Sequence, residues 1–217
     1  SSGVYRFQRN INLINEYKEI YSTDHTIPIK TVYCLSTDNI GRIWMGTEQG
    51  LINYDAYKNT FAYYSNQTDS SGLISNIIYS LHFSKNGFLW IGTPSGLSKM
   101  NVNSSNLMHF TETNGLPNNM IYKILEDNDE NIWVSTNKGL SKFNDKKNAF
   151  VNYGIIEGLQ SYEFNLGSGY FDEKTGEMFF GGIAGLNYFS PSELPENTLE
   201  PNVVITSFQV IDSDGRH

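Results

Sequence analysis

The sequence predicts an all-β protein, a β-propeller fragment of about four to five blades with four antiparallel strands each. The first observation is a motif, Gly-Arg-Ile-Trp-Met-Gly-Thr-Glu-Gln-Gly-Leu at residues 41–51, which returns at 87–97 and 130–140 and, weakened, at 176–186. The second is its spacing, because the Gly-Leu steps at Gly50, Gly96, Gly139 and Gly185 lie 46, 43 and 46 residues apart. A period of about 40 to 50 residues made of short strands is typical of propeller blades.

The third observation is that each full repeat divides into four short strands. In the first full copy these are expected at 31–36, 42–46, 51–54 and 60–64, separated by segments rich in Asn, Asp and Gly that favour hairpin turns. The expected units are a partial blade at 3–18 and blades at about 27–64, 73–110, 116–153 and 159–189. Residues 190–201 hold three of the six prolines and are expected to be a linker. Residues 202–217 are expected to form the first strand of a following β-sandwich or an added outer strand.

A tryptophan recurs on the second strand of each blade. Four antiparallel strands form a blade that cannot bury both faces alone, so its neighbours must cover them. A ring at the same place in each repeat suits this packing better than it suits ligand stacking. The residues predicted to pack between blades are Trp44, Trp90 and Trp133, with Phe179 in place of tryptophan in the fourth copy.

Composition limits the classes of function. The 217 residues carry a formal charge of −8, with no run of Lys or Arg, which argues against nucleic acid as a partner. No apolar run approaches the roughly 18 residues that a membrane-spanning helix needs. The single cysteine, Cys34, cannot form an internal disulfide, and we expect it to be buried and inert. The chain begins inside a repeat, so we expect it to be a fragment of a longer protein.

The repeat resembles that of the two-component regulator propeller family. The residues that carry the resemblance are the Gly-x-Ile-Trp-x-Gly-Thr-x-x-Gly-Leu motif and a Gly-Leu-x-x-Asn segment ahead of the next blade, as at 72–76 and 115–119. The resemblance covers residues 3–212 and implies the periplasmic sensor region of a Bacteroides hybrid two-component regulator, an inner-membrane protein with a histidine kinase elsewhere. It implies an oligosaccharide ligand, and it implies that residues 201–212 open a Tyr-Tyr-Tyr domain.

The sequence offers little support for an enzyme. A sialidase needs clustered arginines, and the chain has four arginines that are scattered along the sequence. A propeller lyase needs a channel histidine with an acid or base partner, and His82 has none that the sequence makes visible. The acidic run 126–130 lacks the spacing of a calcium loop and is expected to be a solvated turn. We therefore expect no enzymatic activity, no cofactor and no metal site in this fragment. The alternative to a sensor is a propeller scaffold for protein–protein interaction, and a propeller lyase ranks after it.

Ligand-binding residues are expected at the channel and at its mouth. Lys123 lies on an inner strand where other copies have Cys34, Ser80 and Gly169, so it should point into the channel or pair with an acid. Amide, carboxylate and aromatic groups suit a sugar site, and the loops expected at the mouth offer Asn76, Asn119, Asn137, Lys138, Tyr162 and Glu163. Because unpaired strand edges invite pairing, self-association is also expected, or else closure into a small ring.

Overall fold

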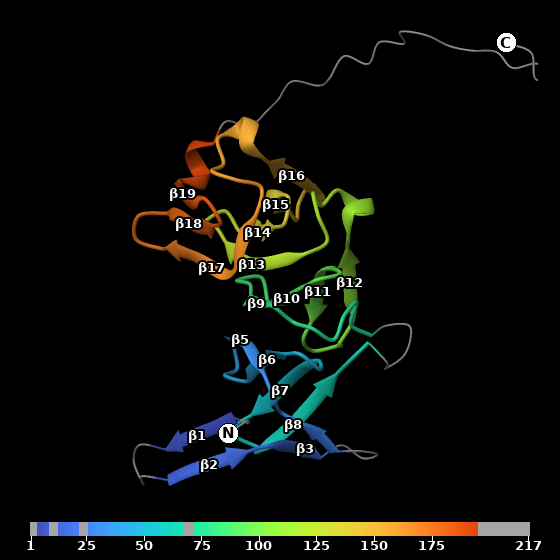
Figure 1. Cartoon of the computed structure of the whole chain (residues 1–217). Coiled ribbons are helices and arrows are strands. Elements are labelled where there is room, and N and C mark those ends of the chain that lie inside the picture. Colours follow the sequence, from blue (N-terminus) through green and yellow to red (C-terminus); the bar gives the residue numbers. More distant parts are fainter. Residues whose placement is uncertain (1–3, 9–12, 22–25, 67–71, 195–217) are drawn as a thin grey trace, which may run out of the picture.

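The chain folds into antiparallel sheets that follow one another along a curved row (Figure 1). The computed structural model describes residues 4–8, 13–21, 26–66 and 72–194. The strands of the four large sheets are β5 (Val32–Thr37), β6 (Ile43–Thr47), β7 (Leu51–Asp55) and β8 (Thr60–Tyr64); β9 (Ser80–Phe83), β10 (Phe88–Thr93), β11 (Gly96–Asn101) and β12 (Leu107–Phe110); β13 (Ile121–Glu126), β14 (Ile132–Thr136), β15 (Gly139–Asn144) and β16 (Ala149–Tyr153); and β17 (Phe164–Asp172), β18 (Glu177–Gly182) and β19 (Gly185–Phe189).

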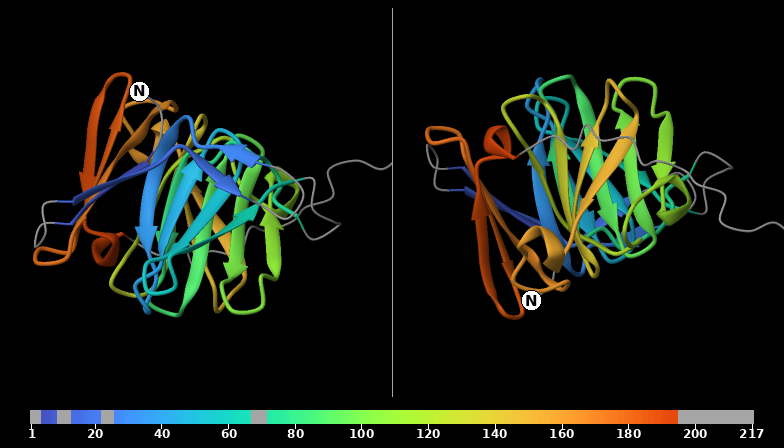
Figure 2. Two further views of the ribbon diagram at one scale, coloured as in Figure 1. Left: turned by 90° about the horizontal axis from the view of Figure 1, so that it is seen from below. Right: turned by 90° about the horizontal axis from the view of Figure 1, so that it is seen from above.

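These four sheets are the blades of a four-bladed β-propeller, which confirms the predicted fold class. Each blade runs from inner to outer strand in chain order, with consecutive strands paired. Backbone and side-chain bonds join neighbouring inner strands, as where the Ile124 amide donates to Ser80 Oγ over 3.0 Å. Figure 2 shows the sheets side by side from two further directions. Strands β5, β9, β13 and β17 therefore line the inside of the row, the surface that we call the axis.

Smaller elements flank the four blades. A hairpin of β1 (Val4–Gln8) and β2 (Leu13–Tyr17) lies where the partial blade is expected. The sequence did not indicate the next hairpin, β3 (Glu19–Tyr21) with β4 (Thr26–Pro28), which replaces the expected loop ahead of the first full blade. Short 3-10 helices are η1 (Glu112–Asn114), η2 (Ile155–Glu157) and η3 (Pro191–Glu193). The expected strand at 202–217, with its Tyr-Tyr-Tyr assignment, lies outside the described residues.

The glycines of the first three Gly-Leu steps are required by a close backbone approach, whereas a Cβ on Gly185 of the fourth would meet nothing within 4 Å. Gly139 has a φ of 100°, a conformation that side chains rarely adopt, and a Cβ there would lie 2.2 Å from the carbonyl oxygen of Tyr153. A Cβ on Gly50 would lie 2.4 Å from the carbonyl oxygen of Tyr64, and one on Gly96 would lie 2.6 Å from that of Phe110. The third strand of a blade can therefore begin beside the end of the fourth only where a side chain is missing.

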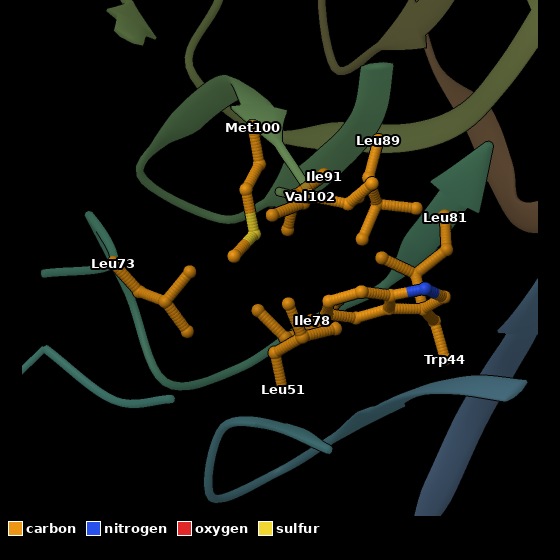
Figure 3. Close-up of a cluster of buried hydrophobic side chains, with 9 residues drawn as sticks. All are labelled: Trp44, Leu51, Leu73, Ile78, Leu81, Leu89, Ile91, Met100 and Val102. Atoms are coloured by element: carbon orange, nitrogen blue, oxygen red, sulfur yellow. The ribbon is translucent and has the colours of Figure 1, made fainter. Parts of the chain in front are cut away.

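Each tryptophan is buried between its own blade and the next one. Trp44, Trp90 and Trp133 are all 0 % exposed. Figure 3 shows Trp44 against Ile78, Leu81 and Leu89, which belong to the following blade. Trp90 and Trp133 lie in clusters of the same kind, with side chains from β13 and from β18 respectively. Aliphatic side chains of one blade thus cover a ring of the blade before it.

Phe179 departs from the expected inter-blade packing. It pairs with Tyr170 and Tyr188 on the two neighbouring strands, and the three form a row across the sheet. The equivalent row of the previous blade is Leu125, Trp133 and Lys142. Tyr170 and Tyr188 are 63 % and 66 % exposed, and Phe179 is only half-buried. The reason is positional, since no further blade among the described residues covers this face, and the last sheet has three described strands rather than four.

Candidate functional site

Backbone bulges aim tyrosines from the inner strands toward the axis. The pairing of β5 with β6 shifts between Val32 and Cys34, and that of β13 with β14 shifts between Ile121 and Lys123. The extra residues at these two shifts are Tyr33 and Tyr122. A bulge leaves one residue unpaired and re-aims its side chain, and bulges are frequent beside functional sites. Tyr33 and Tyr122 therefore do not follow the regular alternation of side chains between the two faces of the sheet.

Two of the three inner-strand tyrosines are in ring contact, and the third is affected electrostatically by one of them and by Glu163. Tyr33 and Tyr79, from adjacent blades, meet edge to face with ring centroids 5.7 Å apart. Burial raises the pKa of Tyr122, and the neighbouring charges of Glu163 and Tyr79 raise it further. Tyr33 remains 41 % exposed. We call Tyr33, Tyr79, Tyr122 and Glu163 the axial tyrosine cluster, and it offers aromatic faces and one acid to a ligand.

Four residues occupy the next position along the inner strands, and they differ sharply in chemistry. Ser80 is buried and accepts the bond from the Ile124 amide. The thiol of Cys34 lies 3.8 Å from the Ile78 carbonyl oxygen, and burial raises its pKa to about 12 despite the opposing effects of the Gly46 amide and the Lys123 charge. Cys34 is half-buried rather than fully buried as expected. Of the four residues at this position, Lys123 is the one that carries a charge.

Lys123 leads into a pocket between the inner strands of the last three blades. Its Cγ would lie 2.7 Å from a Cβ on Gly169, so the lysine stem occupies the space that this glycine leaves open. The pocket has a volume of about 370 Å³, and its polar lining consists of His82, Lys85, Lys123, Glu126, Tyr170 and Glu173. The sequence-predicted Lys123 thus lines a real cavity, a few residues along β13 from the axial tyrosine cluster.

His82 has an acidic partner that sequence reasoning missed. Its Nε2 donates to Glu126 Oε2 over 2.9 Å, and the side chain of Glu126 is only 3 % exposed. The same carboxylate accepts the Lys85 amide at 3.1 and 3.2 Å. Glu126 lies at the end of the inner strand that follows the one bearing His82, so blade adjacency is the signal that could have found the pair.

Two of the predicted mouth residues are engaged within their own loops. Asn76 Oδ1 accepts the backbone amide of Asn66, and Asn119 Oδ1 accepts that of Glu112, each over 2.8 Å. These bonds tie the segment ahead of an inner strand to the segment that ends the previous blade. The asparagine of the Gly-Leu-x-x-Asn segment therefore has a backbone partner in both copies.

The remaining mouth residues come together on one side of the last two blades. The Gly139 amide donates to the Tyr162 carbonyl over 2.7 Å, which places the hairpin with Asn137 and Lys138 beside Tyr162. Asn137 and Lys138 are exposed, and Tyr162 is 44 % exposed. Glu163 follows Tyr162, and its charge raises the pKa of Tyr122 on the inner strand β13. The structure thus brings Asn137 and Lys138 beside Tyr162, whereas the oxygens of Asn76 and Asn119 accept loop amides.

A second cavity, of about 760 Å³, lies between β2 and β8 and is lined by residues 16–20 and 59–61. Two of its charged side chains pair with each other, with Lys18 Nζ 3.2 Å from Glu16 Oε1. Among the described residues no group of three or more His, Cys, Asp or Glu could hold a metal ion, and no helix is long and apolar enough to cross a membrane.

Within the acidic run 126–130, Asp127 holds its own turn. Asp127 accepts the amides of Asp129 and Asn131 at 2.9 and 2.8 Å, and it also accepts Trp133 Nε1 at 2.8 Å. Asp38 accepts Trp44 Nε1 in the same way at 3.0 Å. In both blades, therefore, this carboxylate holds the inter-blade tryptophan.

Comparisons with known proteins agree with this geometry. Segments 26–49, 72–95 and 115–138 match the family profile of the two-component regulator propeller. These three segments are two-component regulator propeller repeats. Each one runs from the segment ahead of an inner strand to the hairpin after the tryptophan strand, so the repeats contain both the tyrosine bulges and the inter-blade rings. No curated protein matches the sequence.

Solved structures place the repeats in context. The extracellular domain assigned to a hybrid two-component system of B. thetaiotaomicron is 29 % identical, with a TM-score of 0.69 over 82 % of this chain and 24 % of that one. The chain thus spans about a quarter of that structure. PorZ, a surface component of the type-IX secretion system of Porphyromonas gingivalis, has 15 % identity, a TM-score of 0.67 and coverages of 87 % and 29 %. Virginiamycin B lyase from Staphylococcus aureus has 14 % identity and a TM-score of 0.60, over 88 % of this chain and 60 % of that one. The last two show the fold alone.

Proposed function

We propose that this chain is part of the extracytoplasmic, periplasmic sensor region of a hybrid two-component regulator, and that it detects oligosaccharides. The observation that carries the proposal is the occurrence of three regulator propeller repeats in a chain 29 % identical to the extracellular domain assigned to such a system. The kinase and DNA-binding functions of such a regulator would belong to other parts of a longer protein. This chain would supply the surface that recognises the signal.

We place the sugar at the axis. Sugar sites combine planar aromatic faces with a few placed polar groups in a concave surface. The ring contact of Tyr33 with Tyr79 and the charge of Glu163 near Tyr122 support this placement. Lys138 and Tyr162 extend this surface at the mouth, which the bond between Gly139 and Tyr162 keeps together.

Calorimetric titration with a panel of oligosaccharides tests the proposal. We expect at least one glycan to bind, and Tyr33→Ala to weaken its binding about tenfold or more, because one well-placed aromatic contact contributes on the order of 1.4 kcal/mol. Tyr162→Ala and Lys138→Ala should weaken binding less, at the rim of the site. Tyr57→Ala is the matched control, since Tyr57 is 92 % exposed on a distant hairpin. Failure of every glycan to bind, or equal effects of Tyr33→Ala and Tyr57→Ala, would contradict the proposal.

One observation favours a second candidate function, a propeller lyase. The His82–Glu126 pair supplies a histidine with an acidic partner inside a pocket, which is the arrangement that general base catalysis uses. Incubation of the protein with the same glycans, followed by analysis for cleaved products, separates the two functions. A sensor binds the glycan and returns it unchanged, whereas a lyase releases a product and loses that activity in His82→Ala.

We also propose that the exposed aromatic face of the last blade binds a second copy of the chain. Tyr170, Phe179 and Tyr188 form the row that a following blade would cover, and the tryptophan at the centre of the equivalent row is fully buried in the other blades. Multi-angle light scattering should show a mass that rises with concentration. Tyr188→Asp should lower that mass toward the monomer, because a charge in an apolar contact is poorly tolerated. A wild-type monomer at all concentrations would refute the proposal.

A further inference from the structure

We propose that the outer edge of the last blade binds an extended segment of a partner polypeptide, which becomes its fourth strand. Each of the other three blades ends in a fourth strand, β8, β12 or β16, that pairs with the third. The last blade ends at its third strand, β19, so one edge of β19 is unpaired among the described residues. A free edge of this kind can accept a strand from another chain. The proposal does not depend on the ligand at the axis.

A fourth strand also fills space between two blades, through an apolar residue near its start. In the third blade this residue is Phe150, which pairs with Phe143 of the third strand. Its ring centroid lies 4.8 Å from that of Phe143 and 5.6 Å from that of Phe110, which belongs to the preceding blade. The residues in the same register of the other two fourth strands are also apolar, and they are Phe61 and Leu107.

The same space in the last blade is a cavity. It has a volume of about 170 Å³ and lies beside Phe189, the residue of β19 that corresponds to Phe143. Its lining includes the counterparts of residues that surround Phe150, and these are Trp133, Leu140, Tyr153 and Leu159. An apolar cavity of about 150 Å³ is large enough to hold a benzene ring. One aromatic side chain of an added strand therefore fits this cavity.

Two equivalent glycines show the difference between the blades directly. A Cβ on Gly115, ahead of the third blade, would lie 3.7 Å from the side chain of Phe150. A Cβ on Gly158, at the same place ahead of the last blade, would meet nothing within 4 Å. Gly158 also lines the cavity. The third blade thus has an aromatic side chain at the point where the last blade has the cavity.

The complete blades also indicate the chemistry of the added strand. Three positions after its apolar residue, each fourth strand has an aromatic one, and these are Tyr64, Phe110 and Tyr153. Their ring centroids lie 5.9 Å from that of the tryptophan in the first two blades and 5.3 Å from it in the third. Phe179, which replaces this tryptophan in the last blade, is only half-buried. The partner segment therefore carries an apolar residue and, three positions later, an aromatic residue that covers Phe179.

A synthetic peptide that copies residues 147–154, the fourth strand of the third blade, is the probe. When it is titrated into the whole chain, the nuclear magnetic resonance signals of the Gly185, Asn187 and Phe189 amides should shift in a saturable way. The amides of β8, β12 and β16 should shift less, although these strands also have a free outer edge. The Phe150→Ala version of the peptide should bind at least about tenfold more weakly, because it does not fill the cavity.

Variants of the chain test the cavity from its other side. Leu194 lines the cavity directly after the 3-10 helix η3, and a larger side chain there should occupy the space that the peptide needs. We expect Leu194→Trp to weaken binding of the peptide at least about tenfold. Ser192→Trp is the matched control, since Ser192 is exposed on the same short helix, and it should leave binding unchanged. Circular dichroism confirms that both variants are folded.

Several results would overturn the proposal. These are no saturable shift of the β19 amides, equal affinity for the two peptides, shifts of the same size along β16, or unchanged binding by Leu194→Trp. Hydrogen exchange of the free chain adds a further check on the β19 amides that do not face β18. Slow exchange at every protein concentration would mean that the chain itself covers this edge, and exchange that slows as the concentration rises would mean that a second copy does. Either result would exclude a partner segment.

Discussion

Replacing Trp133 with alanine is expected to lower the free energy of unfolding by about 3–5 kcal/mol. The ring is fully buried, and its centroid lies 5.3 Å from that of Tyr153 and 5.1 Å from that of Phe189 in the next blade. Removing it deletes apolar contacts on both sides of the blade interface and leaves a cavity that the two rigid sheets cannot close. Urea denaturation followed by fluorescence and circular dichroism measures the loss.

Phe179→Ala is the matched control for this experiment. Phe179 occupies the same position in its blade, but it is half-buried on a face that no described blade covers. Its removal should therefore cost less than half as much as that of Trp133. Equal losses for the two variants would mean that burial between blades is not what makes the repeated ring important.

Replacing Asp38 with alanine is expected to cost about 2–4 kcal/mol, because buried donors are left without acceptors. Its side chain is fully buried and accepts the Arg42 amide at 2.9 Å, Arg42 Nε at 2.6 Å and Trp44 Nε1 at 3.0 Å. Removing the carboxylate unpairs the indole and loosens the hairpin that carries it. Ser84→Ala is the comparison, since Ser84 holds the same position in the next blade, where Trp90 Nε1 already has no partner. Its cost should be about 1 kcal/mol or less.

The contribution of Asp38 should depend on pH. Burial by itself would raise the pKa of this carboxyl, but the bonds from Trp44 and Arg42 outweigh burial and lower the pKa below its usual value. A lowered folded-state pKa stabilises the fold above the unfolded value, near 4, and that contribution is lost as the pH falls through the folded-state pKa. The stability difference between the wild type and Asp38→Ala should therefore shrink below about pH 4. A constant difference down to pH 2 would show that the charge of Asp38 is not involved.

The sequence predicted the blades because their cause is local and repeated. A tryptophan flanked by Gly-Thr and Gly-Leu at a fixed period specifies a buried ring and two hairpins, and the structure has them. The environment of Phe179 could not be predicted in this way. Whether a ring is buried there depends on what covers the next face, and its own repeat does not contain that information.

The site was less visible because it depends on pairing between distant strands. Bulges at Tyr33 and Tyr122 arise from a register shift against the neighbouring strand, which alternation within one strand does not reveal. The partnership of His82 with Glu126 crosses from one blade to the next. Lys123 could be predicted because the other repeats have a small, uncharged residue at the same position of the inner strand. The bonds from Asn76 and Asn119 to loop amides were not visible either, because each joins its residue to the end of the previous blade.

The central claim is that the axis, where the inner strands of the four blades meet, is the ligand-binding surface. Hydrogen exchange followed by mass spectrometry tests it most directly, with and without a glycan that binds in calorimetry. The account predicts slower exchange in the peptides that contain β5, β9, β13 and β17, and little change in the outer strands β8, β12 and β16. Protection confined to the outer strands, with unchanged exchange along the inner strands, would contradict it.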